Sequence, residues 1–247
     1  MTLEYLFFAN VVLLGRLYVH FRDDAPSRQA WIFKGAIELA VLAVAFEFSG
    51  RIAAAGVTVV VFKLLALRGE TRLGPRNLTR LVLGLLELVA LSICFAPAPG
   101  PDFRTFFATV AANLPHWTTL ASPLTALGDY RFHLFCFGLL LAANEANLAI
   151  RAVFDRLNLK SWKSAADVGL VDVSELNRGR IIGVLERALL YIFILQGQFG
   201  AIGFILAAKA FTRFKALDDR SFAEYVLIGT LLSAGLALAI GSFVRSV

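Results

Sequence analysis

Several glutamates of this 247-residue sequence lie within long apolar stretches, where a carboxylate must be paired, protonated or hydrated. Glu38 and Glu87 each lie about 12 Å from the inner end of their stretch, counted at about 1.5 Å per residue. If their helices are neighbours, the two carboxyls can share a proton or face a water-filled cavity, which predicts a proton or cation site. The alternative is a pair of neutral, hydrogen-bonded glutamic acids that fixes helix packing.

A second layer of ionisable groups is expected nearer the inner ends of the stretches. Glu186 and Lys209 are expected to pair, because they lie at similar depth on the two arms of one short hairpin. Asn144, Asn147 and Arg151 share one helical stripe, which lines a substrate path or makes hydrogen bonds between helices. The candidate intramembrane polar site comprises Glu38, Glu87, Asn144, Glu145, Glu186, Arg187, Lys209 and Glu224.

Lysines within the apolar stretches have a second interpretation. A lysine can bury its stem and extend its ammonium to the lipid headgroups, and this is the expectation for Lys34, Lys63 and Lys209 when each is taken singly.

The composition requires membrane-spanning elements to position these groups. Hydrophobic residues make up 58% of the chain and charged residues 17%, so a chain of this length has too little interior to hide its apolar side chains from water. We therefore predict an all-α, polytopic transmembrane helix bundle of about eight spans, each near the length that crosses a bilayer. The predicted spans are 3–20, 30–48, 52–67, 79–96, 131–150, 180–196, 199–214 and 222–244, with Glu47 at the end of the second.

Orientation follows from the basic residues, which are retained on the cytoplasmic side during insertion. The connections 21–29, 68–80, 151–180 and 209–220 hold 16 of the 24 Lys and Arg residues, so these connections are expected on the cytoplasmic side and both termini on the outer side.

Because the basic residues are spread along the chain, nucleic-acid binding is not expected. Two basic connections could instead dock a cytoplasmic protein, through Arg68, Arg72, Arg76, Arg80, Lys160 and Lys163.

The stretch 103–127 is apolar but contains Pro115 and Pro123, which interrupt a lipid-exposed helix. We expect an outer-face helical or re-entrant segment here, and it separates an N-terminal membrane region, 1–130, from a C-terminal one, 131–247.

Motifs for hydrolase, nucleotide and dinucleotide chemistry do not occur in the sequence, so no catalytic residue or cofactor is predicted. The histidines His20, His116 and His133 lack metal-ligand spacing, so no metal site is predicted either.

Cys94 and Cys136 are expected as free thiols packed in the membrane. The alternative is a disulfide between them near the outer face.

Three ordered motifs occur in the C-terminal third: Gly-Arg-Ile-Ile-Gly-x-Leu-Glu-Arg at 179–187, Ala-Ala-Lys at 207–209 and Ala-Glu-Tyr-x-Leu-Ile-Gly-Thr at 223–230. Over roughly 145–242 the chain resembles the C-terminal half of a family of bacterial integral membrane proteins with no assigned function. The resemblance implies a bacterial cytoplasmic (inner) membrane protein and a shared core that includes Glu186, Arg187, Lys209 and Glu224.

Two functional hypotheses follow. The first is a transporter or channel for protons, cations or a small solute that uses the buried glutamates. The second is a non-catalytic membrane anchor, sensor or effector subunit that docks a cytoplasmic partner, with a homo-oligomer as a further possibility. An intramembrane enzyme that acts on lipid ranks third, because no motif supports it.

Overall fold

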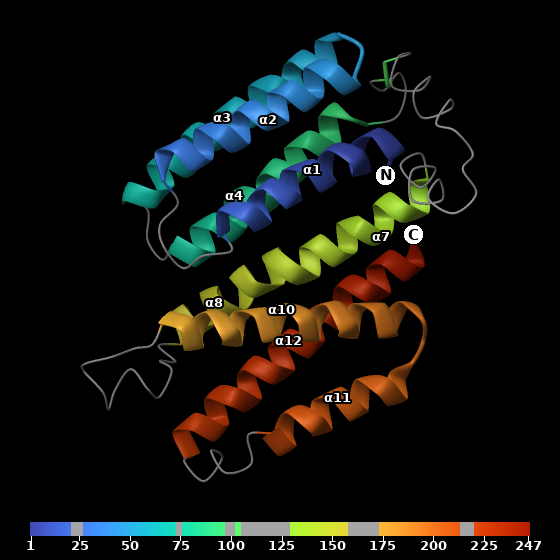
Figure 1. Ribbon diagram of the computed structural model, residues 1–247. Coiled ribbons are helices and arrows are strands. Elements are labelled where there is room, and N and C mark those ends of the chain that lie inside the picture. The colour runs from blue at the N-terminus through green and yellow to red at the C-terminus, as the bar shows by residue number, and fades with distance from the viewer. Residues whose placement is uncertain (21–26, 73–75, 97–101, 105–128, 158–172, 213–219) are drawn as a thin grey trace. The chain divides into compact units, whose positions relative to one another are not determined.

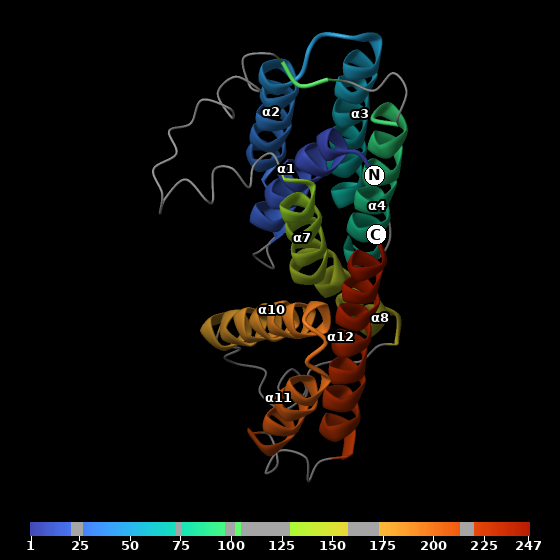
Figure 2. The same ribbon diagram turned by 90° about the vertical axis from the view of Figure 1, so that its right-hand side faces the viewer.

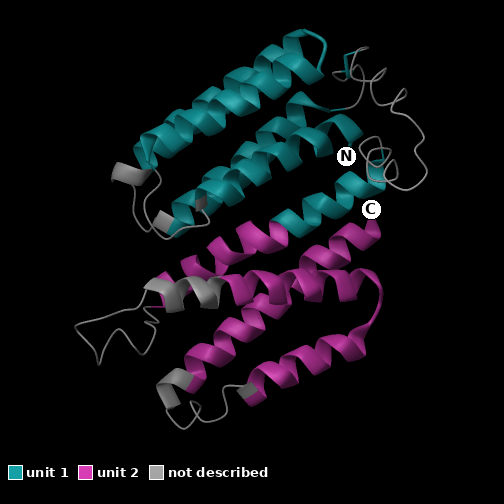
Figure 3. Ribbon diagram, viewed as in Figure 1, with its two compact units in different colours: residues 1–140 teal, residues 141–247 magenta. Residues whose placement is uncertain are grey.

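A computed structural model of the chain describes residues 1–20, 27–72, 76–96, 102–104, 129–157, 173–212 and 220–247. The described part is helical, apart from one isolated bridge between Phe46 and Phe103, so the all-α prediction is confirmed for these residues. The chain divides into two compact units, residues 1–140 and 141–247 (Figure 3). The division expected after residue 130 falls at the start of a helix of the first unit.

The first unit contains α1 (Leu3–His20), α2 (Arg28–Ala45), α3 (Gly50–Arg72), α4 (Arg76–Cys94) and α7 (Tyr130–Leu140). Helix α1 contacts α2, α4 and α7, and α3 contacts α2 and α4, so the first four helices close a ring (Figures 1 and 2). Ser27 caps α2 by accepting a hydrogen bond from the backbone N–H of Ala30 at 3.1 Å.

One end of this unit is aromatic. Phe46 pairs with Phe103 in the isolated bridge, their rings stack at a centroid distance of 5.1 Å, and Phe7 packs edge-on against both. The backbone N–H of Arg104 donates to the carbonyl of Ala45 at 2.8 Å, so residues 102–104 are tied to the end of α2. Of the expected outer-face segment 103–127, the part from 105 onward lies outside the described residues.

The end of α2 differs from the prediction. The helix stops at Ala45, and Glu47 lies in the exposed connection that follows, where its N–H donates to the carbonyl of Asp102 at 3.1 Å. Glu47 therefore lies outside α2, beyond the end of the predicted span's helix.

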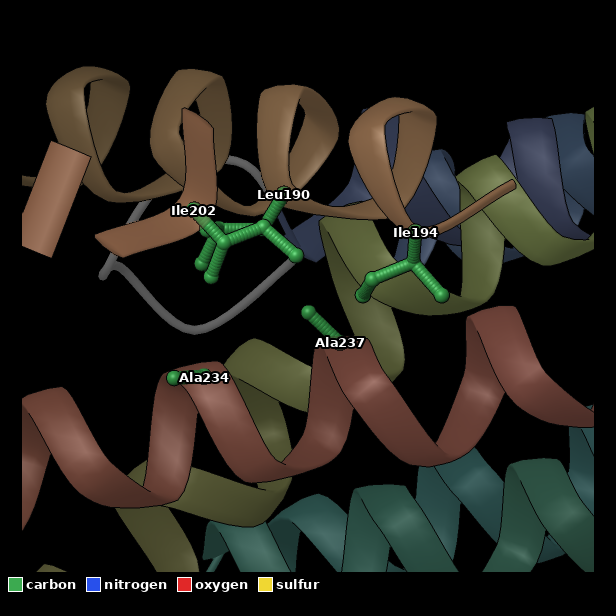
Figure 4. Packing of buried hydrophobic residues seen from close by; sticks show 5 residues of the cluster. All are labelled: Leu190, Ile194, Ile202, Ala234 and Ala237. Carbon is green, nitrogen blue, oxygen red and sulfur yellow. The ribbon is translucent and has the colours of Figure 1, made fainter. Parts of the chain in front are cut away.

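The second unit contains a π-helical turn η2 (Leu141–Glu145), α8 (Ala146–Arg156), α10 (Val173–Leu195), α11 (Phe199–Thr212) and α12 (Arg220–Ser246). Helix α12 contacts α8, α10 and η2, and α11 contacts α10. Ala237 points from α12 toward the α10 side chains in the core cluster (Figure 4). The members of this cluster are Leu190, Ile194, Ile202, Ala234 and Ala237.

The turn between α10 and α11 confirms the predicted short hairpin. Gly197 adopts a φ of 71°, a left-handed conformation that glycine tolerates without a steric cost, and the N–H of Gln198 donates to the carbonyl of Phe193 at 2.8 Å.

Within the described residues, four helical segments are long and apolar enough to cross a membrane, so the predicted count of about eight spans is not confirmed. They are Gly50–Gly69, Asn77–Cys94, Tyr130–Arg156 and Ala223–Ser246. Phe199–Phe211 is apolar but shorter, and α2 carries the charged residues Arg28, Lys34 and Glu38 within its 18 residues.

Burial in α2 is the reverse of that in a water-soluble helix. The charged residues Lys34 and Glu38 are 3% and 1% exposed, whereas Ile32 and Phe33 are 65% and 61% exposed. Soluble proteins rarely bury charges while exposing large apolar side chains on the same helix. The distribution is compatible with a membrane protein.

Candidate functional site: a buried charge network in the first unit

Four charged side chains meet inside the ring of α1 to α4. Lys34 donates to Oε1 of Glu38 one helical turn along α2. Lys63 of α3 places its Nζ 2.8 Å from Oε2 of Glu38 and 2.5 Å from Oε1 of Glu87 on α4. We call Lys34, Glu38, Lys63 and Glu87 the charge network; all four residues are buried.

Sequence spacing and small residues explain how the network fits. Lys34 and Glu38 are four residues apart, so both lie on the face of α2 that points into the ring. A Cβ atom at Gly15 of α1 would lie 3.1 Å from the Lys34 stem, and one at Gly35 would lie 3.3 Å from the Lys63 stem. These two glycines therefore give the lysine stems room to cross the interior.

Arg16 of α1 extends the positive region of the site. It is buried, and its Nη2 donates to the backbone carbonyl of Arg80 at 2.9 Å. Its guanidinium lies against α4 at Gly84, where a Cβ atom would collide with it. The charge of Arg16 also acts on Glu87 through space. The guanidinium borders a small cavity with mostly apolar walls, lined by Arg16, Trp31, Ala66, Gly69, Thr79, Arg80 and Leu83.

Two sequence-based expectations are wrong here. Glu38 and Glu87 do not pair with each other: Lys63 lies between them and forms an ion pair with each, instead of the two carboxyls sharing a proton directly. Lys34 and Lys63 do not snorkel, because each ammonium reaches a carboxylate inside the ring and is 3% and 7% exposed, respectively. The i, i+4 spacing of Lys34 and Glu38 was the one signal in the sequence that could have identified this pairing.

A second buried polar group lies in the second unit. Arg187 of α10 donates from Nε to the carbonyl oxygen of Ala142 at 2.8 Å and from Nη2 to that of Ala143 at 3.2 Å. Both acceptors lie in η2, where Asn144 also donates to Oε1 of Glu145 at 2.8 Å, and both of these side chains are buried. A π-helical turn disturbs the regular carbonyl pattern of a helix, and Arg187 satisfies two of its carbonyls.

The predicted pair between Glu186 and Lys209 is present. Lys209 Nζ lies 2.6 Å from Glu186 Oε2, and each side chain is partly buried. Glu224 is exposed, while Asn147 and Arg151 are partly buried. The eight candidate residues are therefore divided between the two units, with Glu38 and Glu87 in the first unit and the remaining six in the second.

The predicted docking residues are only partly described. Arg68 is exposed near the end of α3 and Arg80 is partly buried in α4. Arg72 and Arg76 lie at helix ends, and Lys160 and Lys163 lie outside the described residues.

Metal-ligating groups do not gather in threes among the residues that the structure describes. His133 of α7 is buried, and its carbonyl oxygen accepts from Nδ2 of Asn10 at 3.0 Å. His116 lies outside the described residues. Cys94 and Cys136 are free thiols, as predicted.

No family model, curated protein or solved structure matches this chain. The resemblance of 145–242 to a bacterial membrane-protein family therefore stays a prediction.

Proposed function

We propose that this chain is an integral protein of the bacterial cytoplasmic membrane, with about eight spans and both termini outside, that moves protons together with a small solute. The observation that carries the proposal is the charge network, buried among helices whose outer surfaces expose large apolar side chains. Ionisable groups in such a position are costly to bury, and they mark ion and proton pathways in membrane proteins.

The pairing within the network favours protons over metal cations. A metal cation bound at Glu38 or Glu87 would have to displace ammonium groups that already lie at 2.8 and 2.5 Å from the carboxylate oxygens. A proton that binds Glu87 releases this carboxyl from Lys63, its lysine partner. The network can therefore hold a proton at the cost of one ion pair.

Proteoliposomes that contain the purified protein and a lumenal pH dye test this function. We expect a lumenal pH change under at least one imposed driver: a membrane potential, or a gradient of sodium, potassium, chloride or phosphate. Glu87→Gln should reduce the change to the level of empty liposomes, because glutamine does not titrate. Glu47→Gln makes the same chemical change at an exposed residue outside the network and should leave the signal intact.

The opposite result would exclude this function. If folded protein gives no Glu87-dependent change in lumenal pH under any of these drivers, the charge network only fixes the packing of α2, α3 and α4.

A non-catalytic anchor or sensor subunit is the second candidate, and the exposure of Arg68 near the end of α3 supports it. In this function a cytoplasmic protein or a second copy of the chain should copurify in mild detergent, and Arg68→Glu should reduce its recovery. Recovery of the chain alone at every expression level speaks against this candidate.

A further inference from the structure

The charge network is balanced, with two ammonium groups and two carboxylates. Glu38 uses both oxygens, Oε1 for Lys34 and Oε2 for Lys63. Glu87 contacts one ammonium among the described residues, that of Lys63. Protonation of Glu87 therefore breaks one ion pair, whereas protonation of Glu38 breaks two.

On the basis of the proposed function, we propose that the solute that accompanies the proton is a small anion, held by Lys63 once Glu87 has taken up the proton. When Glu87 becomes neutral, Lys63 must share Glu38 with Lys34, and the network changes from neutral to a net charge of +1. An uncompensated charge is expensive in a dry, apolar interior. An anion next to the Lys63 ammonium restores neutrality.

The surroundings of Glu87 strengthen this choice of solute. Arg16 lies against α4 at Gly84, one turn from Glu87, and adds positive potential there. Lys63 from α3 contacts Glu87 directly, and the charges of Lys34 on α2 and Arg16 on α1 act on it from further away. A cationic solute would meet like charge from these three groups, whereas an anion would meet opposite charge from each of them and like charge from Glu38.

The charges balance in each transport cycle. A proton from the water on one side of the membrane forms an O–H bond at a Glu87 oxygen. A monovalent anion then takes the place of that carboxylate beside Lys63. On the other side the O–H bond breaks, the proton returns to water, the anion departs, and the ion pair between Lys63 and Glu87 forms again. One positive and one negative charge cross together, so the cycle is electroneutral.

Two separate sets of gradients in the same proteoliposomes test the solute class. In the first, sodium is constant and external gluconate is replaced by chloride or by monobasic phosphate. In the second, the anion is constant and sodium or potassium varies. We expect Glu87-dependent lumenal acidification in the first set, at a rate that a valinomycin-clamped potential does not change. The anion inference is overturned if the Glu87-dependent acidification follows only the sodium or potassium gradients, or only the membrane potential. In that case the proposed transport function still stands.

Binding in detergent provides a readout that is independent of transport. Proton and anion must raise each other's affinity by the same factor, so chloride or phosphate affinity measured by calorimetry should increase as the pH falls, by at most about tenfold per pH unit for one proton. Glu87→Gln resembles the protonated state, and it should bind the anion without pH dependence.

The lysine variants complete the test. Lys63→Met should lose anion binding. If this variant does not fold, the double variant Lys63→Met with Glu87→Gln replaces it, because it keeps the Lys34–Glu38 pair. The double variant should lose anion binding as well. Anion affinity that is independent of pH in the unchanged protein, or that survives the loss of Lys63, overturns the inference.

Discussion

Arg187 and Ala142 are joined by a hydrogen bond of 2.8 Å, in which the guanidinium Nε of α10 donates to a carbonyl oxygen of the π-helical turn. Arg187 also reaches the next carbonyl, that of Ala143, at 3.2 Å. A single side chain therefore ties α10 to the irregular turn that begins the second unit.

We predict that Arg187→Leu destabilises the protein, because it removes the hydrogen bonds that a charged donor makes to two buried carbonyls, at a cost of about 1–3 kcal/mol each. Arg187→Lys should recover part of the loss, since an ammonium can reach one carbonyl but lacks the planar fork of a guanidinium. Thermal unfolding in detergent measures both effects. Arg245→Leu, at an exposed residue near the end of α12, serves as the control. An unfolding temperature for Arg187→Leu equal to that of the control would contradict the role given to Arg187.

Two glycines of α12 should respond in opposite directions to the same substitution. A Cβ atom at Gly241 would lie 2.7 Å from Cγ2 and 3.0 Å from Cβ of the buried Ile194, whereas one at Gly235 would meet nothing within 4 Å. Gly241→Ala should cost about 1–3 kcal/mol through overpacking. Gly235→Ala should leave stability unchanged or raise it by up to about 1 kcal/mol through helix propensity. Equal effects in detergent unfolding would contradict the close packing of Gly241 against Ile194.

Stability should distinguish the loss of Lys63 alone from the loss of Lys63 and the Glu87 charge together. Lys63→Met strands Glu87 and deprives Glu38 of one partner, so we predict a loss of about 3–5 kcal/mol. The double variant Lys63→Met with Glu87→Gln leaves the Lys34–Glu38 pair complete and should unfold close to the unchanged protein. A double-mutant cycle measures the coupling. Additive effects would exclude a direct pair between Lys63 and Glu87.

The two ends of α3 should lie on opposite sides of the membrane. Phe48, 85% exposed, precedes the helix, and the exposed Arg68 lies near its end. In a background with both native cysteines replaced by serine, an impermeant maleimide should label Phe48→Cys in intact cells and Arg68→Cys only after lysis. The reverse pattern would invert the orientation inferred from the basic connections.

Local features were the ones that could be predicted from the sequence. The hairpin that ends α10 and begins α11 follows from two glycines in an uncharged turn, and the pair between Glu186 and Lys209 follows from the hairpin because both residues lie on its arms. The alternation of apolar stretches with basic connections likewise predicted helices close to those observed.

Features that depend on distant parts of the chain could not be predicted in this way. The end of α2 at Ala45 is set by the bridge of Phe46 to Phe103, and no spacing near Glu47 reveals that contact. The position of Lys63 between Glu38 and Glu87 depends on α3 lying beside both α2 and α4, and helix periodicity alone carries no information about neighbours. The π-helical turn arises in Leu141–Glu145, a sequence with no glycine or proline to mark it.

The distribution of the charge network along the chain has a consequence for biogenesis. Helix α2 carries a lysine and a glutamate that neutralise each other within one turn, so it needs no later helix to offset its charge. Helices α3 and α4 carry one uncompensated member each, Lys63 and Glu87, and they are consecutive in the chain. A nascent chain that enters the bilayer with α3 and α4 already folded into a hairpin delivers Lys63 and Glu87 as a finished pair, whereas α3 entering before α4 would have only Glu38, already paired with Lys34, to offset its ammonium.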